Sequence, residues 1–425
     1  AEEPALIELK TGQAMHLSAE LFLAEGDSFD AFMAWVRAKG LPEPPQPRYP
    51  FRDALDRIAL AYNSHLWIEG SGWGGLESPG APPQPPMGVA RYVKENPGSP
   101  VARGLAGKLA WALQQPSVNE PSREGIRSRT NTRRFALLTR DKQLQWGRQL
   151  LSFQQADGSF RFDPGGRHTS LLVGTQHYEI AEAVYKPLGR AGETALDLNT
   201  HPAMELLILG RLTGEQSFRG GARKALDYCL DMRRPEGGDW WETPLFSPNL
   251  LAAGHSAIAY YLGYEAFQDR RYLERAIYWL RTMLTFTHLW QPKEVIQLYD
   301  TKPCYNSTNW YGNSWVNSHV LWQILRIFAM SGEQDIHWAA IDREVDWHRY
   351  HRGITIAGLR WMLDHKDPAL AAPYLRARKQ FQEGLYDTLL VDTHSPVTGI
   401  YGGLLIEPHT IGINLYALID REKRE

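Results

Sequence analysis

Cysteine is almost absent from this chain, which has only Cys229 and Cys304 among its 425 residues. Two cysteines can form at most one disulfide, so a disulfide scaffold is excluded, and we expect two packed thiols. No CxxC or HExxH sequence occurs, so no structural zinc motif and no zincin motif is present. The sequence therefore predicts no metal site and no cofactor.

Long apolar runs and an excess of one charge sign are also missing. No run of 18 apolar residues occurs, so no membrane span is predicted. The chain has 46 basic and 48 acidic residues, a formal charge of −2, which argues against a nucleic-acid partner and a polybasic membrane surface. The first residues, Ala1 to Pro4, contain neither an initiator Met nor a signal peptide, so we expect a mature secreted or periplasmic chain.

Aromatic residues, in contrast, are abundant, with 15 Trp, 19 Tyr and 14 Phe. A hydrophobic core uses many aromatic rings. A sugar-binding cleft uses others, because a flat ring covers the apolar face of a pyranose. The position of each ring along the chain decides between these two uses.

Most of the chain has the pattern of helices of 12 to 20 residues separated by loops rich in Gly, Pro and aromatic residues. We therefore expect an all-α fold with little β-structure, with residues 1–50 as an N-terminal extension and 51–425 as one catalytic domain. The predicted helices are Phe51–Trp67, Val101–Gln114, Thr139–Gln155, Leu171–Leu188, His201–Leu212, Phe218–Met232, Leu250–Gln268, Arg271–Thr287, Trp315–Met330 and His351–Leu363.

Two kinds of helix alternate along the chain. The segment Leu250–Gln268 is apolar on nearly every side, which is typical of a helix that is buried all round. The segment Tyr272–Met283 has one apolar stripe at i, i+3, i+4 and i+7, which is typical of an amphipathic helix. This alternation predicts two concentric layers of helices, an inner ring and an outer ring.

Three of the loops share an order of acidic, Gly and aromatic residues. Their aromatic members, Trp73, Phe160 and Trp240, are 87 and 80 residues apart. Loops at equivalent points of a repeat emerge at the same end of a ring of helical hairpins. The repeat therefore predicts that these loops meet around one opening.

With these features the chain resembles the α/α-toroid enzymes, chiefly the six-hairpin glycosidase-like glycoside hydrolases and polysaccharide lyases. The resemblance lies in the helical hairpins over residues 51–365 and in the aromatic loops at Trp73, Asp239–Glu242 and Asn309–Tyr311. It implies a toroid of about six hairpins with a carbohydrate site at one end. The loop Gln155–Phe160 also looks like a repeat of the triterpene cyclases, but the Asp-x-Asp-Asp acid motif of those enzymes is absent.

The loop Asp239–Glu242 provides the pair of residues favoured for hydrolysis. Cleavage of a glycosidic bond needs one protonated and one ionised carboxyl group, and aromatic neighbours raise a carboxyl pKa by desolvation. We expect Asp239 and Glu242 to be catalytic. The expected substrate-binding residues of the loops are Trp73, Glu77, Phe160, Asp163, Trp240, Trp241 and Trp310, and Glu77 and Asp163 are also candidate acid–base partners.

A second group of candidates suits a lyase, in which neutral polar groups hold a uronate carboxylate and move its C5 proton. The segment from Asp300 to His319 is dense in Asn, Tyr and His, which are costly to bury unpaired and therefore favour a wet cleft. The candidates for catalysis are Asn309, Tyr311, His177, Tyr178 and His255, and those for substrate binding are Asn313 and His319.

The function predicted from these patterns is carbohydrate cleavage by carboxylate acid–base hydrolysis in a Trp-lined cleft. A polysaccharide lyase acting on a uronate-containing polymer is the first alternative. A non-catalytic glycan-binding toroid is the second, because it would keep the aromatic rings without converging acids. The sugar, the linkage and the oligomeric state stay open.

Overall fold

The fold is described from a computed structural model of the chain. The structure describes residues 10–41, 51–64, 67–70, 72–73, 87–114, 135, 138–162, 189–237, 245–246, 248 and 250–285.

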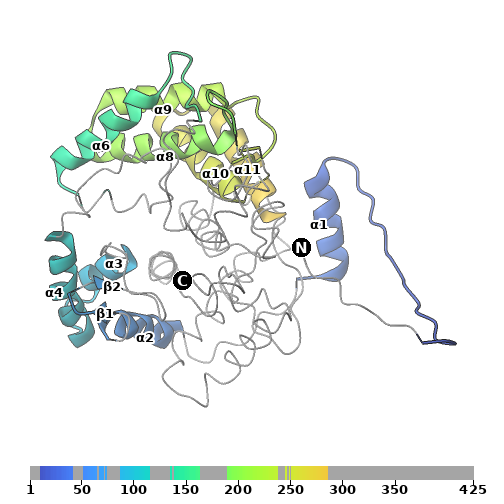
Figure 1. Cartoon of the computed structure of the whole chain (residues 1–425), viewed down its shortest axis with the longest axis horizontal. Coiled ribbons are helices and arrows are strands. Elements are labelled where there is room, and N and C mark those ends of the chain that lie inside the picture. Colours follow the sequence, from blue (N-terminus) through green and yellow to red (C-terminus); the bar gives the residue numbers. More distant parts are fainter. Residues whose placement is uncertain are drawn as a thin grey trace.

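Almost all of the regular structure in these residues is helical (Figure 1). A single antiparallel pair of two-residue strands, β1 (Trp67–Ile68) and β2 (Gly72–Trp73), places Trp67 opposite Trp73. The helices are α1 (Ser28–Lys39), α2 (Phe51–Asn63), α3 (Met87–Glu95), α4 (Pro100–Gln114), α6 (Arg140–Phe153), α8 (Leu196–Thr213), α9 (Gln216–Tyr228), α10 (Leu250–Phe267) and α11 (Arg270–Leu284).

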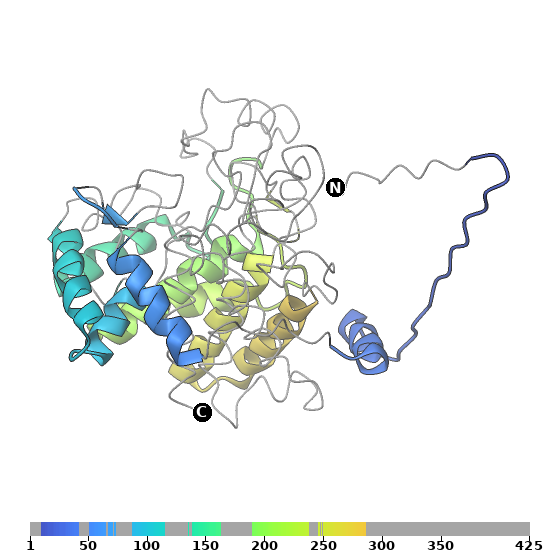
Figure 2. The ribbon, with the colours of Figure 1, turned by 90° about the horizontal axis from the view of Figure 1, so that it is seen from below.

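Short turns connect successive helices, which places them side by side. Gly214 ends α8 in the left-handed conformation, and its N–H donates to Gly210 O at 3.0 Å before α9 begins. Gln268 has a φ of 56° between α10 and α11, and Asp269 caps α11 by accepting from Arg271 N. Viewed down the shortest axis, helices α2 to α11 follow an arc (Figure 1), and the side view shows α10 and α11 running beside one another (Figure 2).

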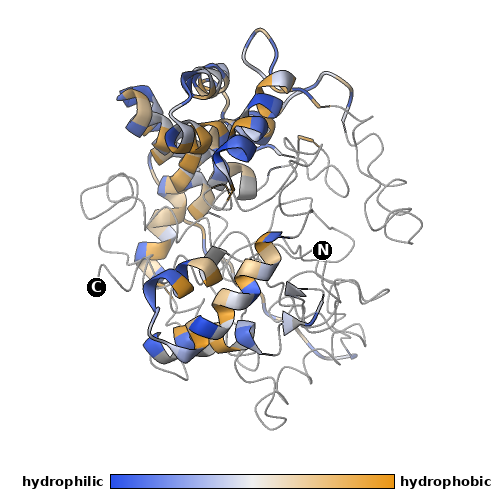
Figure 3. Cartoon of the chain, turned by 90° about the vertical axis from the view of Figure 1, so that its left-hand side faces the viewer, coloured by the Kyte–Doolittle hydropathy of each residue, from blue (hydrophilic) through white to orange (hydrophobic). Residues whose placement is uncertain are grey.

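Helices α8 and α10 are the buried members of these pairs, as the sequence pattern predicts for α10. Residues 252–260 of α10 are all buried, and most residues of α8 are buried on every side. Helices α9 and α11 instead bury one stripe, such as Phe218, Ala222 and Ala225 of α9. Apolar residues gather where helices meet and polar residues on the outer surfaces (Figure 3). The predicted alternation of buried and amphipathic helices is therefore confirmed for these two hairpins.

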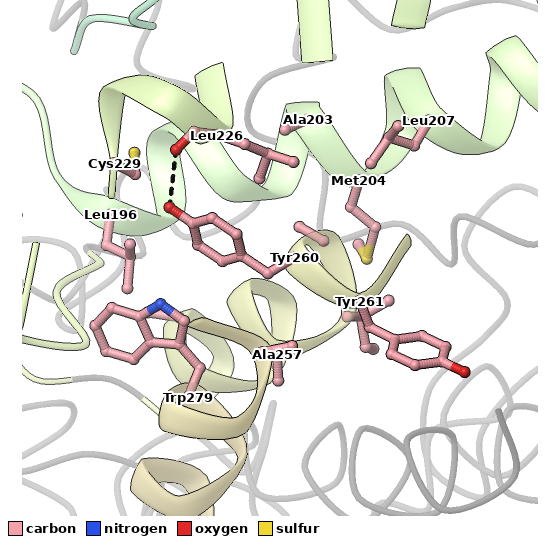
Figure 4. Packing of buried hydrophobic residues seen from close by; sticks show 14 of the residues in the cluster. Leu196, Ala203, Met204, Leu207, Leu226, Cys229, Ala257, Tyr260, Tyr261 and Trp279 are labelled. Carbon is pink, nitrogen blue, oxygen red and sulfur yellow. Dashed lines mark hydrogen bonds between the residues drawn. The ribbon is translucent and has the colours of Figure 1, made fainter. Parts of the chain in front are cut away.

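The core between these helices combines aliphatic side chains, such as Leu196, Met204 and Leu226, with aromatic rings (Figure 4). Trp279 of α11 and Tyr260 of α10 are completely buried, and the Tyr260 hydroxyl donates to Leu226 O at 2.9 Å. Cys229 is buried beside them as a free thiol, and burial raises its pKa. These interactions fix α9, α10 and α11 to one another.

Helix α1 lies in the predicted N-terminal extension and was not anticipated. It begins with a capping box, in which Asp27 accepts from Asp30 N and Asp30 accepts from Asp27 N. Arg281 of α11 pairs with Asp30 at 2.7 Å, and its guanidinium lies over the Phe29 ring. Helix α1 is thus attached to the helical body through α11.

Several predicted boundaries need correction. Helix α2 ends at Asn63 instead of Trp67, because Trp67 enters the β1–β2 hairpin. Helix α8 begins at Leu196 instead of His201, so Pro202 lies inside it. Helix α3 was missed. None of the described helices combines the length and apolar content that crossing a membrane requires.

Candidate functional site

The first of the three repeated loops forms the turn of the β1–β2 hairpin. Gly70 and Gly72 have positive φ values of 75° and 95°, which lets the chain reverse direction. Trp73 is only 3% exposed, its indole N–H donates to Tyr62 O at 2.9 Å, and its ring meets that of Trp67 edge to face. Its packing is that of a core residue, and its predicted sugar-binding role stays a prediction.

The second repeated loop is attached to the start of α8. Asp157 accepts from Ser159 N and Oγ, and Gly158 turns the chain with a φ of 90°. The Phe160 N–H donates to Asn199 Oδ1 at 2.8 Å, and Phe160 O accepts from Thr194 Oγ1 at 2.7 Å. The Phe160 ring is completely buried, so its predicted contact with sugar is not supported by an exposed face in this structure.

The third repeated loop starts directly against the same end of α8. The Asp197 N–H donates to Glu236 O at 3.0 Å, and Glu236 forms an isolated antiparallel bridge with Pro248. A Cβ on Gly237 would lie 2.7 Å from Asp197 Cβ and 3.3 Å from Ala252 Cβ. The backbone that leads into residues 238–244 therefore rests on Asp197 and on the first turns of α10.

Asp197 and His255 make the closest polar contact at this end of the two helices. His255 Nδ1 lies 2.7 Å from Asp197 Oδ1, joining α10 to the first turn of α8. The His255 residue is 5% exposed, and the Asp197 side chain is 19% exposed. Thr200 and Ser256 share a hydrogen bond of 2.9 Å between the same two helices, which keeps the pair in register.

A row of ionisable side chains continues from Asp197 down one face of α8, because residues four apart on a helix are neighbours. His201 stacks on His255 with ring centroids 4.2 Å apart and 19° between the planes. His201 Nε2 lies 3.6 Å from Glu205 Oε1, and Glu205 Oε2 accepts from Trp146 Nε1 of α6 at 3.3 Å. Glu205 is completely buried.

Within the described residues, Asp197, His201 and His255 form the group with the chemistry of a metal site. Each offers one donor atom, and these atoms all lie within 4.8 Å of one another. Two imidazoles and one carboxylate are ligands that zinc accepts. The prediction of no metal site rested on the lack of zinc motifs, and it had no information about residues that meet only in the fold.

Glu236 is an acidic residue of the third loop whose backbone contacts Asp197. Burial raises the pKa of its carboxyl, and the charge of Arg234 opposes that shift. The Arg234 guanidinium lies 3.0 Å from Glu236 Oε1. The Glu236 carboxyl therefore already has an ion-pair partner in Arg234.

Of the predicted site residues, the structure describes Trp73, Phe160 and His255, and it brings only His255 to the cluster. Asp197, Asn199, His201 and Glu205 were not proposed as site residues, although the spacing Asp197, His201, Glu205 in an apolar segment could have indicated them. The others lie outside the described residues, namely Glu77, Asp163, His177, Tyr178, Asp239, Trp240, Trp241, Glu242, Asn309, Trp310, Tyr311, Asn313 and His319.

Comparison with known proteins supports the fold. No protein-family model matches the chain, and no curated protein matches it. The chain is similar to the structure of the unsaturated glucuronyl hydrolase of Bacillus sp. GL1, responsible for the degradation of glycosaminoglycan, with a TM-score of 0.50 and 12% identity. The match covers 88% of this chain and 97% of that one.

A second structure, an unsaturated glucuronyl hydrolase specific for heparin, matches over the same shares of the two chains with a TM-score of 0.38 and 11% identity. The likeness to the Bacillus structure shows that the chain has an all-α, α/α-toroid fold, as the sequence predicted.

Proposed function

We propose that the chain is a glycoside hydrolase that cleaves a glycosidic bond of a poly- or oligosaccharide. The reaction would take place near the N-terminal ends of α8 and α10, against which the described residues Glu236 and Gly237 pack. The observation that carries this proposal is the buried Asp197–His255 pair, on which the start of the third repeated loop rests. The toroid fold, shared with a glucuronyl hydrolase, supports it.

The requirements of glycoside hydrolysis assign the acid and the base to residues 238–244. Glycoside hydrolysis needs a protonated carboxyl that donates to the leaving oxygen and an ionised one that acts as base or nucleophile. Asp239 and Glu242 are the two acids of the loop, and Trp240 and Trp241 between them offer faces for a sugar ring. Asp197 supplies a further carboxylate beside the loop, positioned by His255, for binding sugar hydroxyls.

A saccharide panel that includes uronate-containing oligosaccharides tests the proposal. We expect reducing ends to be released by the wild-type chain, and Asp239→Asn and Glu242→Gln each to lower kcat by about 100-fold or more, as expected for loss of an acid or base. Asp231→Asn and Glu274→Gln are matched controls, because Asp231 is exposed in the turn after α9 and Glu274 is exposed on α11. Both controls should keep full activity.

The panel also separates the alternatives. A lyase makes an unsaturated product, so an increase in ultraviolet absorbance without hydrolysis would replace the hydrolase with the lyase. Binding without turnover over the whole panel would favour the glycan-binding toroid. Full activity in both Asp239→Asn and Glu242→Gln would contradict the assignment of acid and base.

A further inference from the structure

We propose that Asp197, His201 and His255 bind one divalent transition-metal cation of the zinc class. No sequence motif indicates such a site, because the three residues come from two helices and converge only in the fold. The inference rests on the proposed function and deepens it, since the cluster includes the Asp197–His255 pair that carries that proposal. Cation binding is measured without substrate, so the two proposals can fail separately.

The atom types of the three donor groups indicate which class of cation the cluster binds. Two imidazole nitrogens and one carboxylate oxygen suit zinc and its neighbours in the first transition row, whereas calcium and magnesium prefer oxygen ligands alone. Three protein donors leave a fourth position for water or a substrate oxygen. Cys229 does not compete as a ligand, because its thiol is buried in the core and burial raises its pKa.

The geometry is close to that of a formed site. Zinc bonds of about 2.1 Å in a tetrahedral arrangement hold donor atoms roughly 3.4 Å apart. Here all three donors lie within 4.8 Å of one another, and Asp197 Oδ1 and His255 Nδ1 are 2.7 Å apart. The hydrogen bond between Thr200 and Ser256 holds the two helices that carry these donors together.

The surroundings of His201 resemble those of a metal ligand. A histidine that binds a metal is usually oriented by a carboxylate or carbonyl on its other ring nitrogen. Glu205 lies 3.6 Å from His201 Nε2 and is itself held by the Trp146 indole N–H. A completely buried carboxylate therefore lies beside the His201 ring, four residues further along the same helix.

Direct binding to the full chain tests the site. The chain is stripped with a chelator, and Zn²⁺ binding is measured by titration calorimetry, with Co²⁺ absorbance as a second probe of nitrogen and oxygen ligation. We expect one Zn²⁺ per chain, with Kd at least about 100-fold higher in His201→Gln and His255→Gln, and about 10-fold higher in Glu205→Gln. His16→Gln is the matched control, because His16 is exposed in the N-terminal segment.

Each other outcome overturns the proposal. Zn²⁺ binding that is unchanged in His201→Gln and His255→Gln would place the cation elsewhere in the chain. Absence of binding, or Ca²⁺ binding that Zn²⁺ does not displace, would leave the cluster as a hydrogen-bonded network. Circular dichroism confirms that each variant is folded, and Asp197→Asn gives a third variant that keeps the shape of the side chain.

Discussion

Asn199 holds the second repeated loop to the start of α8, and its replacement by alanine gives a strong test of this architecture. The side chain is completely buried. Its Oδ1 accepts from Phe160 N at 2.8 Å, and its Nδ2 donates to Thr194 Oγ1 and Ala195 O, each at 2.7 Å. All three contacts are lost in Asn199→Ala.

The expected loss of stability comes from the buried polar groups that lose their partner when the Asn199 side chain is removed. A buried N–H without a partner costs about 1–3 kcal/mol, and each further hydrogen bond contributes about 1 kcal/mol. Thr194 Oγ1 still donates to Phe160 O, so part of the second loss is recovered. We expect Asn199→Ala to lower the free energy of unfolding by about 3 kcal/mol.

Urea unfolding followed by circular dichroism measures this change. Gln155→Ala is the matched control, because Gln155 is exposed in the same loop and its side chain donates only to Phe153 O. The control should change the free energy of unfolding by no more than about 0.5 kcal/mol. If Asn199→Ala is as stable as Gln155→Ala, the attachment of this loop to α8 is wrong.

Three further predictions concern the packing and the charges. A Cβ on Gly147 would lie 2.2 Å from Phe218 Cζ, so Gly147→Ala should lower the free energy of unfolding by about 1–3 kcal/mol, whereas Gly220→Ala, with open space around it, should not destabilise the chain in the same urea experiment. Tyr260→Phe removes the buried hydrogen bond to Leu226 O and should cost about 1 kcal/mol, and an unchanged urea midpoint would contradict that bond. The Asp30 pKa is lowered by the Asp27 N–H and then by Arg281, so its contribution is present above its ordinary pKa of 3.8 and is lost as the pH falls through the lowered value. The stability difference between wild type and Asp30→Asn should therefore be largest near pH 7 and decrease as the pH falls through the lowered pKa, and a pH-independent difference would refute the role of its charge.

The sequence predicted best which helices are buried on all sides and which bury only one face. The continuous apolar run of α10 and the single stripe of α11 each led to the correct burial, because burial follows directly from the pattern of apolar residues. The ends of the helices were predicted less well, because tertiary contacts can override the local sequence signals that start or stop a helix. Pro202 suggested a helix start, but α8 accommodates it six residues inside, since one missing N–H is a small loss in a helix packed on every side.

Side-chain exposure in the loops could not be predicted in the same way. Trp73 and Phe160 follow glycines with positive φ, and those turns direct both rings into the core instead of outward. The Asp197, His201 and Glu205 row was missed for a related reason. Polar residues at helical spacing look like a solvated face, whereas the structure shows that most of α8, including His201 and Glu205, is buried.

The central proposal is that saccharide cleavage takes place near the Asp197–His255 pair, which joins the N-terminal part of α8 to α10. Reducing-end release from uronate-containing oligosaccharides by Asp197→Asn, compared with wild type and with the exposed control Asp231→Asn, tests it most directly. We expect hydrolysis by the wild type and the control, and at least about a 10-fold loss of kcat/KM in Asp197→Asn, which corresponds to about 1.4 kcal/mol. Undiminished activity in Asp197→Asn, or no hydrolysis by the wild type, would contradict the account.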